Sequence, residues 1–350
     1  MINFNNGTIT FNSHWLKPSK LPPFTLRLLY ADGETPIFEH GTAVQVTSSP
    51  NIWDLTYNNT DWSYLLFDHG GAPYYIEPGI PGSRGTLLEI IEGNTTGVTN
   101  LAYAFNNCKY LRSIPLLDTS NVTNMYYTFH NNAAMTSFPL FDTHNVIEMV
   151  GMFANCSSIK TIPLYDTSNC RAFGYMFADC TNLESIPLLD TSKGGLRDVQ
   201  TISTDMDFYG MFTRCSKLTT IPLIDTSHGQ DFIYMFEQSG IVTCPELDTS
   251  SGRRFTAMFN ACYELTELPV FDYTSLTRNE YSTGPKTDNM FMNCYKVSGG
   301  SYANYLRIKA IADANGWDSS YTFTNCGRDT VTGAAELQQI PQSWGGLAAG

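Results

Sequence analysis

The sequence predicts an α/β solenoid, a stack of coils made of short parallel strands and short helices with a period of about 24 residues. A small, mainly β module is expected to close its N-terminal end. The block Ile-Pro-Leu-x-Asp-Thr-Ser occurs at 114–120, 162–168, 186–192 and 221–227. The block Phe-x-x-Cys lies between these copies, and its Phe recurs at steps of 23, 24, 32 or 35 residues. A unit of this size cannot bury its own apolar face, so successive units must stack.

Within one repeat, the apolar residues change their spacing. Ile114 and Leu116 lie two positions apart, which is the spacing of residues that point inward from a strand. Pro115 lacks an N–H, so this strand must be short. The turn 118–120 leads into the segment 122–129, whose apolar residues follow helical spacing. We therefore expect each coil to hold one brief strand and one or two helical turns.

Three segments make up the chain in this interpretation. Residues 1–86 form the N-terminal module, in which 24–30 and 43–46 read as strands. Residues 87–328 form the solenoid, which begins with a degenerate coil. Residues 329–350 form a C-terminal tail rich in small residues.

The repeats resemble those of a known family. The copies Cys108-x-x-Leu111-x-x-Ile114-Pro115, Asn121-Val122-Thr123-Asn124-Met125 and Met152-Phe153-Ala154-Asn155-Cys156 resemble BspA-like leucine-rich repeats. They are most similar to the branch with Asp-Thr-Ser-Asn-Val-Thr-Asn-Met and Met-Phe-x-x-Cys. The resemblance implies a solenoid of leucine-rich-repeat type and a surface or adhesion module. An N-terminal module ahead of the array is similar to the arrangement in proteins of tailed phages.

Composition and charge exclude some classes of function. The chain has 20 Lys+Arg and 33 Asp+Glu, and its net charge of −13 repels a phosphate backbone. We expect no nucleic-acid partner. The N-terminus shows no secretory signal, and no apolar run is long enough to span a bilayer, so we expect no membrane insertion.

All nine cysteines lie at repeat positions, and seven of them are three residues after the anchor Phe. A free Cys behaves as a small buried hydrophobic residue, so a ladder of buried thiols is the expected arrangement. Stacked coils would also permit an occasional disulfide. Zinc fits less well, because Cys-x-x-Cys pairs are absent.

Aspartates form the most chemically suggestive row, with one Asp at the same turn of each repeat. Stacked carboxylates could bind Ca²⁺, but Asp at a turn also accepts hydrogen bonds from backbone N–H groups. We expect capping, with no metal and no cofactor. His144 replaces the Ser of its turn, and no catalytic motif is present. We expect no enzymatic activity; the carboxylates of a glycan-active enzyme would have to come from the insertions.

Two further rows are candidate binding surfaces. The residue before each Asp is apolar or aromatic, as at Phe141, Tyr165 and Phe271. If Ile114 and Leu116 point inward, alternation directs this row outward, where it would mark an interface. If the chain turns at this point, the row enters the core. A row of tyrosines two residues before the anchor Phe suits sugar stacking and suits packing between coils equally well.

Two insertions break the period at about 193–207 and 277–286, and both follow the Asp-Thr-Ser turn. Insertions in repeat proteins map to one face, often the binding face. This edge supplies the remaining candidate binding residues, which are Arg197, Tyr209, Arg278, Tyr281 and Lys286. A third insertion, 302–314, reads as a helix that Gly316 ends.

We therefore expect a non-enzymatic structural or recognition protein on a phage virion, as a fibre, tail or capsid-decorating component. Its partners would be other virion proteins or a host-surface protein or glycan, and a homo-oligomer is also allowed. The virion would be assembled in the bacterial cytoplasm. The alternative is an adhesin on the bacterial cell surface.

Overall fold

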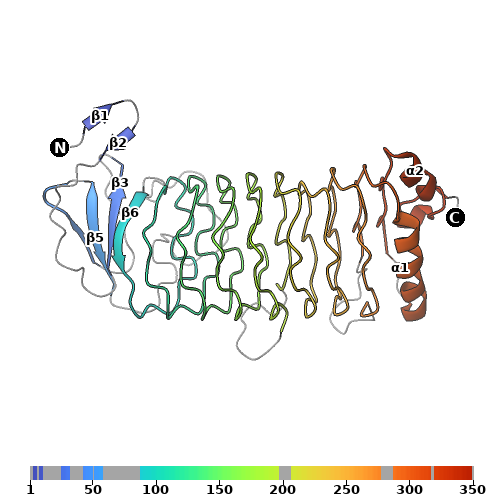
Figure 1. Ribbon diagram of the computed structural model, residues 1–350, viewed down its shortest axis with the longest axis horizontal. Helices are drawn as coiled ribbons and strands as arrows, with labels where there is room; N and C mark the ends of the chain where they lie inside the picture. Colours follow the sequence, from blue (N-terminus) through green and yellow to red (C-terminus); the bar gives the residue numbers. More distant parts are fainter. Residues whose placement is uncertain are drawn as a thin grey trace.

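Stacked coils occupy the middle of the computed structural model, with a β-sheet at one end and helices at the other (Figure 1). The structure describes residues 3–5, 8–10, 25–31, 42–49, 51–57, 87–196, 206–276, 287–316 and 319–348. The strands are β1 (Asn3–Asn5), β2 (Thr8–Thr10), β3 (Thr25–Tyr30), β4 (Thr42–Gln45), β5 (Ile52–Thr56) and β6 (Leu87–Asn94). The helices are α1 (Ser301–Asn315), α2 (Val331–Leu337) and the 3-10 helix η2 (Gln342–Trp344).

The prediction of an α/β solenoid of leucine-rich-repeat type is wrong. In the described ranges, extended strands lie only in the antiparallel pair β1-β2 and in a four-stranded antiparallel sheet of order β4-β5-β3-β6. The α-helices there are α1 and α2, near the C-terminus. The coils consist of turns joined by isolated parallel bridges, such as Asn124↔Glu148.

Two features of the repeat prevent regular elements from forming in the coils. Tyr127 and Asn131 have φ angles of 50° and 62°, in the left-handed region that an α-helix of L-residues does not contain. Equivalent left-handed residues recur along the stack, so the predicted helical turns do not form. The proline at each strand position removes a ladder donor and limits the strand.

Backbone hydrogen bonds hold one coil to the next. The N–H of Tyr127 donates to the carbonyl of Val150 at 2.8 Å, and the N–H of Phe129 donates to that of Met152 at 3.0 Å. The Tyr103–Tyr126 pair repeats this pattern one coil earlier. Each coil therefore satisfies the backbone groups of its neighbour although it contains no regular strand.

The core is a pair of parallel ring stacks. The anchor phenylalanines stack in pairs with ring centroids 5.1 to 6.1 Å apart, from Phe105 to Phe323. A second stack runs from Phe173 through Phe208 and Phe232 to Phe255. All these rings are fully buried.

Strand β6 joins the N-terminal sheet to the coils. One edge of β6 pairs with β3 in antiparallel fashion. On its other edge, the N–H of Ile90 donates to Ser113 at 3.1 Å, and the N–H of Arg112 donates to Leu88 at 2.9 Å. The sheet thus covers the edge that the first coil would otherwise expose.

The C-terminal segment closes the opposite end. Helix α1 is the predicted helix, and Gly316 ends it in the left-handed conformation with φ 65°. The N–H of Phe323 in the last coil donates to the carbonyl of Trp344 at 3.0 Å. The Trp344 ring is buried and lies edge-on to Tyr305 of α1. No helix within the described ranges has the length and apolarity that crossing a membrane requires.

Candidate functional site

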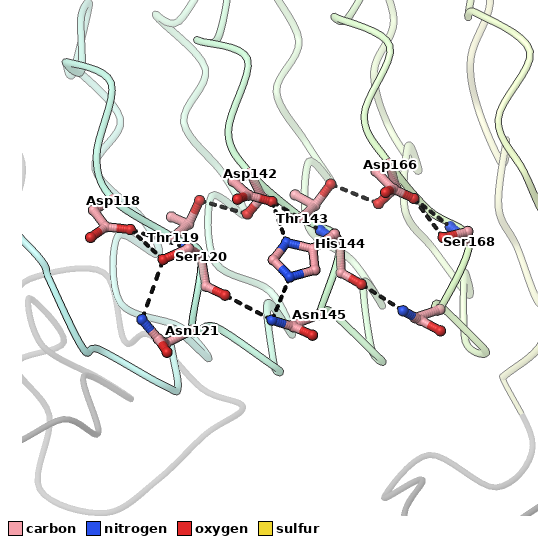
Figure 2. A network of polar contacts seen from close by, with 11 residues as sticks. Asp118, Thr119, Ser120, Asn121, Asp142, Thr143, His144, Asn145, Asp166 and Ser168 are labelled. Carbon is pink, nitrogen blue, oxygen red and sulfur yellow. Dashed lines mark hydrogen bonds and ion pairs between the residues drawn. The ribbon is translucent and has the colours of Figure 1, made fainter.

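In the turn Asp-Thr-Ser-Asn, the aspartate side chain closes the turn by hydrogen bonds. Oδ1 of Asp118 accepts bonds from the backbone N–H and the hydroxyl of Ser120, at 3.1 and 2.7 Å (Figure 2). Asp166 makes the same pair of contacts with Ser168. In the coil between them, Asp142 accepts from Nδ1 and the backbone N–H of His144. Each Asp therefore closes its own turn, as predicted for a cap.

The threonine of the turn points inward and bonds to the next coil. The hydroxyl of Thr119 donates to the backbone carbonyl of Asp142 at 2.7 Å, and Thr143 donates to that of Asp166 at the same distance (Figure 2). The same bond recurs from Thr95 through Thr249. These threonines are buried, so the bond replaces solvation of the hydroxyl.

The asparagine of the turn reaches back to the preceding coil. Nδ2 of Asn145 donates to the carbonyl of Ser120 at 2.8 Å, and Nδ2 of Asn169 donates to that of His144 at 2.6 Å (Figure 2). The Asp thus closes the turn itself, the Thr bonds to the following coil and the Asn bonds to the preceding coil. These hydrogen bonds within and between coils explain why the motif is repeated.

The aspartate row is exposed and acidic. Hydrogen bonds from Ser120 hold the pKa of Asp118 below its usual value, and those from Ser168 do the same for Asp166. These carboxylates are therefore ionised at neutral pH. Among the residues that the structure describes, no group of three or more His, Cys, Asp and Glu side chains is arranged to hold a metal ion.

The nine cysteines are free thiols, and all but the partly buried Cys244 are buried, as the repeat register predicted. Sγ of Cys156 donates to the carbonyl of Phe129 at 3.1 Å, and Cys215 donates to that of Phe177 at 3.0 Å. Burial raises the pKa of Cys156 to about 12. A buried thiol with a raised pKa stays protonated, whereas the form that reacts as a nucleophile is the thiolate. These thiols therefore have a structural role.

The tyrosine row packs on itself. The rings of Tyr103 and Tyr127 stack with centroids 5.5 Å apart. A Cβ on Gly151, in the same position of the next coil, would lie 2.5 Å from the ring of Tyr127. The tyrosine therefore covers the glycine of its neighbour, which favours coil packing over sugar stacking for this row.

Tyr209, from the predicted insertion edge, is half-buried beside this row. Its ring lies 4.9 Å from that of Tyr175 and 5.6 Å from that of Tyr234. Burial raises its pKa above the usual value. The other insertion candidates, Arg197, Arg278, Tyr281 and Lys286, lie outside the described residues.

The sequence left two arrangements open for the row before each Asp, and the structure has the one in which the row enters the core. Phe141 and Tyr165 are 2% exposed and Phe271 is 3% exposed, so none of them offers a binding surface. In two coils a bend at the proline accounts for this. The N–H of Phe141 donates to the carbonyl of Pro139 at 3.0 Å, and Leu247 makes the same bond to Pro245. In these coils the two-residue bend breaks strand alternation, and the residue before the Asp enters the core.

The residue that the alternation had placed inside is exposed instead. Leu116 was predicted to point inward, but it is 66% exposed. Equivalent residues in the following coils are also between 56% and 66% exposed. We call this set the leucine row; it comprises Leu116, Leu140, Leu164, Leu188, Leu223 and Val270.

In the sequence, exposed polar positions lie on both sides of each member of the leucine row. Two residues after each member is an exposed Asp of the turn, such as Asp142 or Asp166. Three residues before each member is a mostly Ser or Thr position, such as Ser137 or Thr161, which is also exposed. The apolar residue recurs at this position in the sequence, but the assumption of strand alternation wrongly assigned it to the core.

Buried charges were not predicted. Asp231 is fully buried and accepts a hydrogen bond from Nη2 of Arg254 at 2.7 Å. Asp207, a carboxylate of the first insertion, is also buried and accepts from the N–H of Gln230 at 2.8 Å. Asp207 therefore supports the backbone of the next coil, and Asp231 pairs with a side chain of the next coil.

The repeats also match a known family model, described as Mycoplasma protein of unknown function, DUF285, over residues 85–193 and 195–305. This chain belongs to that family. The match is compatible with the BspA-like repeats that the motifs resemble. No curated protein matches the chain, and no solved structure does.

Proposed function

We propose that this DUF285 protein is a non-enzymatic recognition and structural protein displayed on a phage virion, as a fibre, tail or capsid-decorating component. It acts by binding, and its partners are a host-surface protein or glycan or other virion proteins. The stack of coils is the binding element, and the end segments connect it to a larger assembly.

The leucine row is the observation that carries this proposal. Single exposed apolar side chains are common on proteins, but here leucines are exposed at the same position of five successive coils, from Leu116 to Leu223, before Glu246 interrupts the row. Surfaces of this kind mark interfaces. The fold does not require leucine at this position, because Glu246 occupies the same place in one coil.

The polar side chains of the repeat support binding over catalysis. Asp166, Thr167 and Asn169 are all engaged in hydrogen bonds within the turn or between coils. Asp231 is buried and accepts a hydrogen bond from Arg254, and Asp207 is buried and accepts one from the backbone. These groups build the stack.

Display on a virion is favoured by the resemblance to the arrangement in tailed phages, with an N-terminal module ahead of BspA-like repeats. The resemblance to surface and adhesion repeats also favours an adhesin on the bacterial cell surface, which is the second candidate. The two differ in where the protein is found.

Electron microscopy with gold-labelled antibody to this chain, on native particles and on cells of the producing culture, tests the location. Label on intact particles is the expected result. Label confined to the cell envelope would contradict display on a virion and would support the bacterial adhesin. Purified protein should also bind host cells or particle components, and failure to bind either would refute the recognition function.

A further inference from the structure

The leucine row and the aspartate row run in parallel over the coils, and together they indicate the chemistry of a partner. Five leucines and one valine supply an apolar contact line. Every coil of that line also presents an Asp carboxylate two residues later, from Asp118 to Asp272. A partner that covers both rows must bring apolar side chains bordered by cationic ones.

We propose that these two rows form a docking surface for a cationic amphipathic helix of a partner protein. This inference rests on the proposed recognition function and specifies the chemistry of the partner.

The spacing of the rows favours a helix over an extended segment. Adjacent coils lie about 4.8 Å apart, as strands of a sheet do. A helix presents side chains on one face about every 5.4 Å, whereas an extended strand presents them about every 6.6 Å. Over the four steps from Leu116 to Leu223, a helix falls out of register by only about 2 Å and a strand by about 7 Å.

Charge disfavours a second copy of this chain as the occupant. Each copy carries a net charge of −13 and a row of exposed aspartates. Joining two such surfaces would bring like charges together, which costs free energy. A cationic segment instead gains attraction along the whole row and a faster association rate.

The first experiment uses three labelled peptides and the full-length protein, with binding measured by fluorescence anisotropy. One peptide has Leu at helical spacing on a Lys background, the second has the same composition with Leu at alternate positions, and the third has Glu in place of Lys. We expect tight binding of the first, weaker binding of the second and none of the third. Equal binding of the Lys and Glu peptides, or no binding of the helical Lys peptide, overturns the proposal.

The apolar contribution is tested with Leu140→Ser, Leu164→Ser and Leu188→Ser combined. This variant should lower the affinity for the helical Lys peptide at least about tenfold. The matched control is Leu306→Ser with Leu347→Ser, because these leucines are 50% and 62% exposed outside the row. The control should bind as the parent does, and parental affinity in the row variant would show that only charge attracts the peptide.

The ionic contribution is tested with Asp142→Asn, Asp166→Asn and Asp190→Asn combined. Asn retains the oxygen that closes the turn, so the fold is kept while three charges are lost. We expect weaker binding with a shallower dependence on salt, and an unchanged salt dependence overturns the role of the aspartates.

The remaining outcomes separate this inference from the proposed function. Sedimentation that shows a dimer of the parent but not of the serine variant, with no peptide binding, assigns the surface to a second copy. If the protein labels particles and binds host cells but the serine variant does so equally well, the recognition function stands and the docking surface is wrong.

Discussion

Sγ of Cys180 donates a hydrogen bond of 3.1 Å to the backbone carbonyl of Phe153, which belongs to the preceding coil. The same contact joins Cys294 to Phe259. The thiol of Cys180 adds a second hydrogen bond to a buried carbonyl that also accepts from the N–H of Cys156 at 3.0 Å. A small, polarisable side chain suits this place, and Asn132 and Ser239 occupy it in two of the coils.

Thiol reactivity follows from this arrangement. Burial raises the pKa of Cys180 well above its usual value and that of Cys262 to about 12, so almost no thiolate forms near neutral pH. We expect alkylation of the native protein to modify few of the nine sites, with the partly buried Cys244 first. Mass spectrometry before and after denaturation measures this, and rapid modification of most sites in the native state would contradict it.

Phe177 lies in the middle of the ring stack, with its centroid 6.0 Å from that of Phe153 and 5.7 Å from that of Phe212. Phe177→Ala should lower the free energy of unfolding by about 3–5 kcal/mol, because the ring leaves a cavity that neighbouring coils cannot fill. Urea denaturation measures the change. Leu188→Ala is the control, since Leu188 is 61% exposed and its loss should change stability by less than about 0.5 kcal/mol. Equal losses in the two variants would argue against the stack as the core.

Much of the stacked core could be predicted from the sequence, because repeat position and burial coincide. The anchor Phe and the Cys three residues later are buried wherever the structure describes them. Helix α1 was predicted from its apolar spacing and the Gly316 stop, which act locally.

The secondary structure within a coil could not be predicted, because left-handed residues decide it. Tyr103 and Tyr127 are residue types that rarely adopt positive φ, and only the stacking of coils holds them there. The exposure of the leucine row was missed for a related reason. The bend between Pro139 and Phe141 shifts the inward positions from a spacing of two to a spacing of three, which alternation alone does not reveal.

The inter-coil threonine bond should contribute more stability than the exposed aspartate of the same turn. Thr167→Val removes the donor to the Asp190 carbonyl, a part-buried bond of 2.7 Å, and should cost about 1–3 kcal/mol because the acceptor is left unpaired. Thr167→Ser keeps the hydroxyl and should lose less. Asp166→Ala affects an exposed group, so its loss should be smaller than that of the valine variant. Thermal and urea denaturation of the three variants measure the order, and a reversed order would contradict this account of the turn.

His130 should make stability depend on pH in a window that the aspartates do not share. Its Nδ1 lies 2.8 Å from Oδ1 of Asn106, and burial lowers its pKa to about 4, with a partly offsetting effect from Asp179. Below pH 6.5 the unfolded chain takes up a proton that the native His130 does not, so stability must fall as the pH falls from about 6.5 to about 4.

At 1.36 kcal/mol for each pH unit, the loss approaches about 3 kcal/mol. Asp118 and Asp166 of the turns have lowered pKa values, so their contribution is lost only below their usual pKa. His130→Gln should therefore flatten the stability profile between pH 6.5 and 4 and leave the fall at lower pH in place. Urea denaturation across this range measures both, and a parental slope in the variant would show that another group causes the dependence.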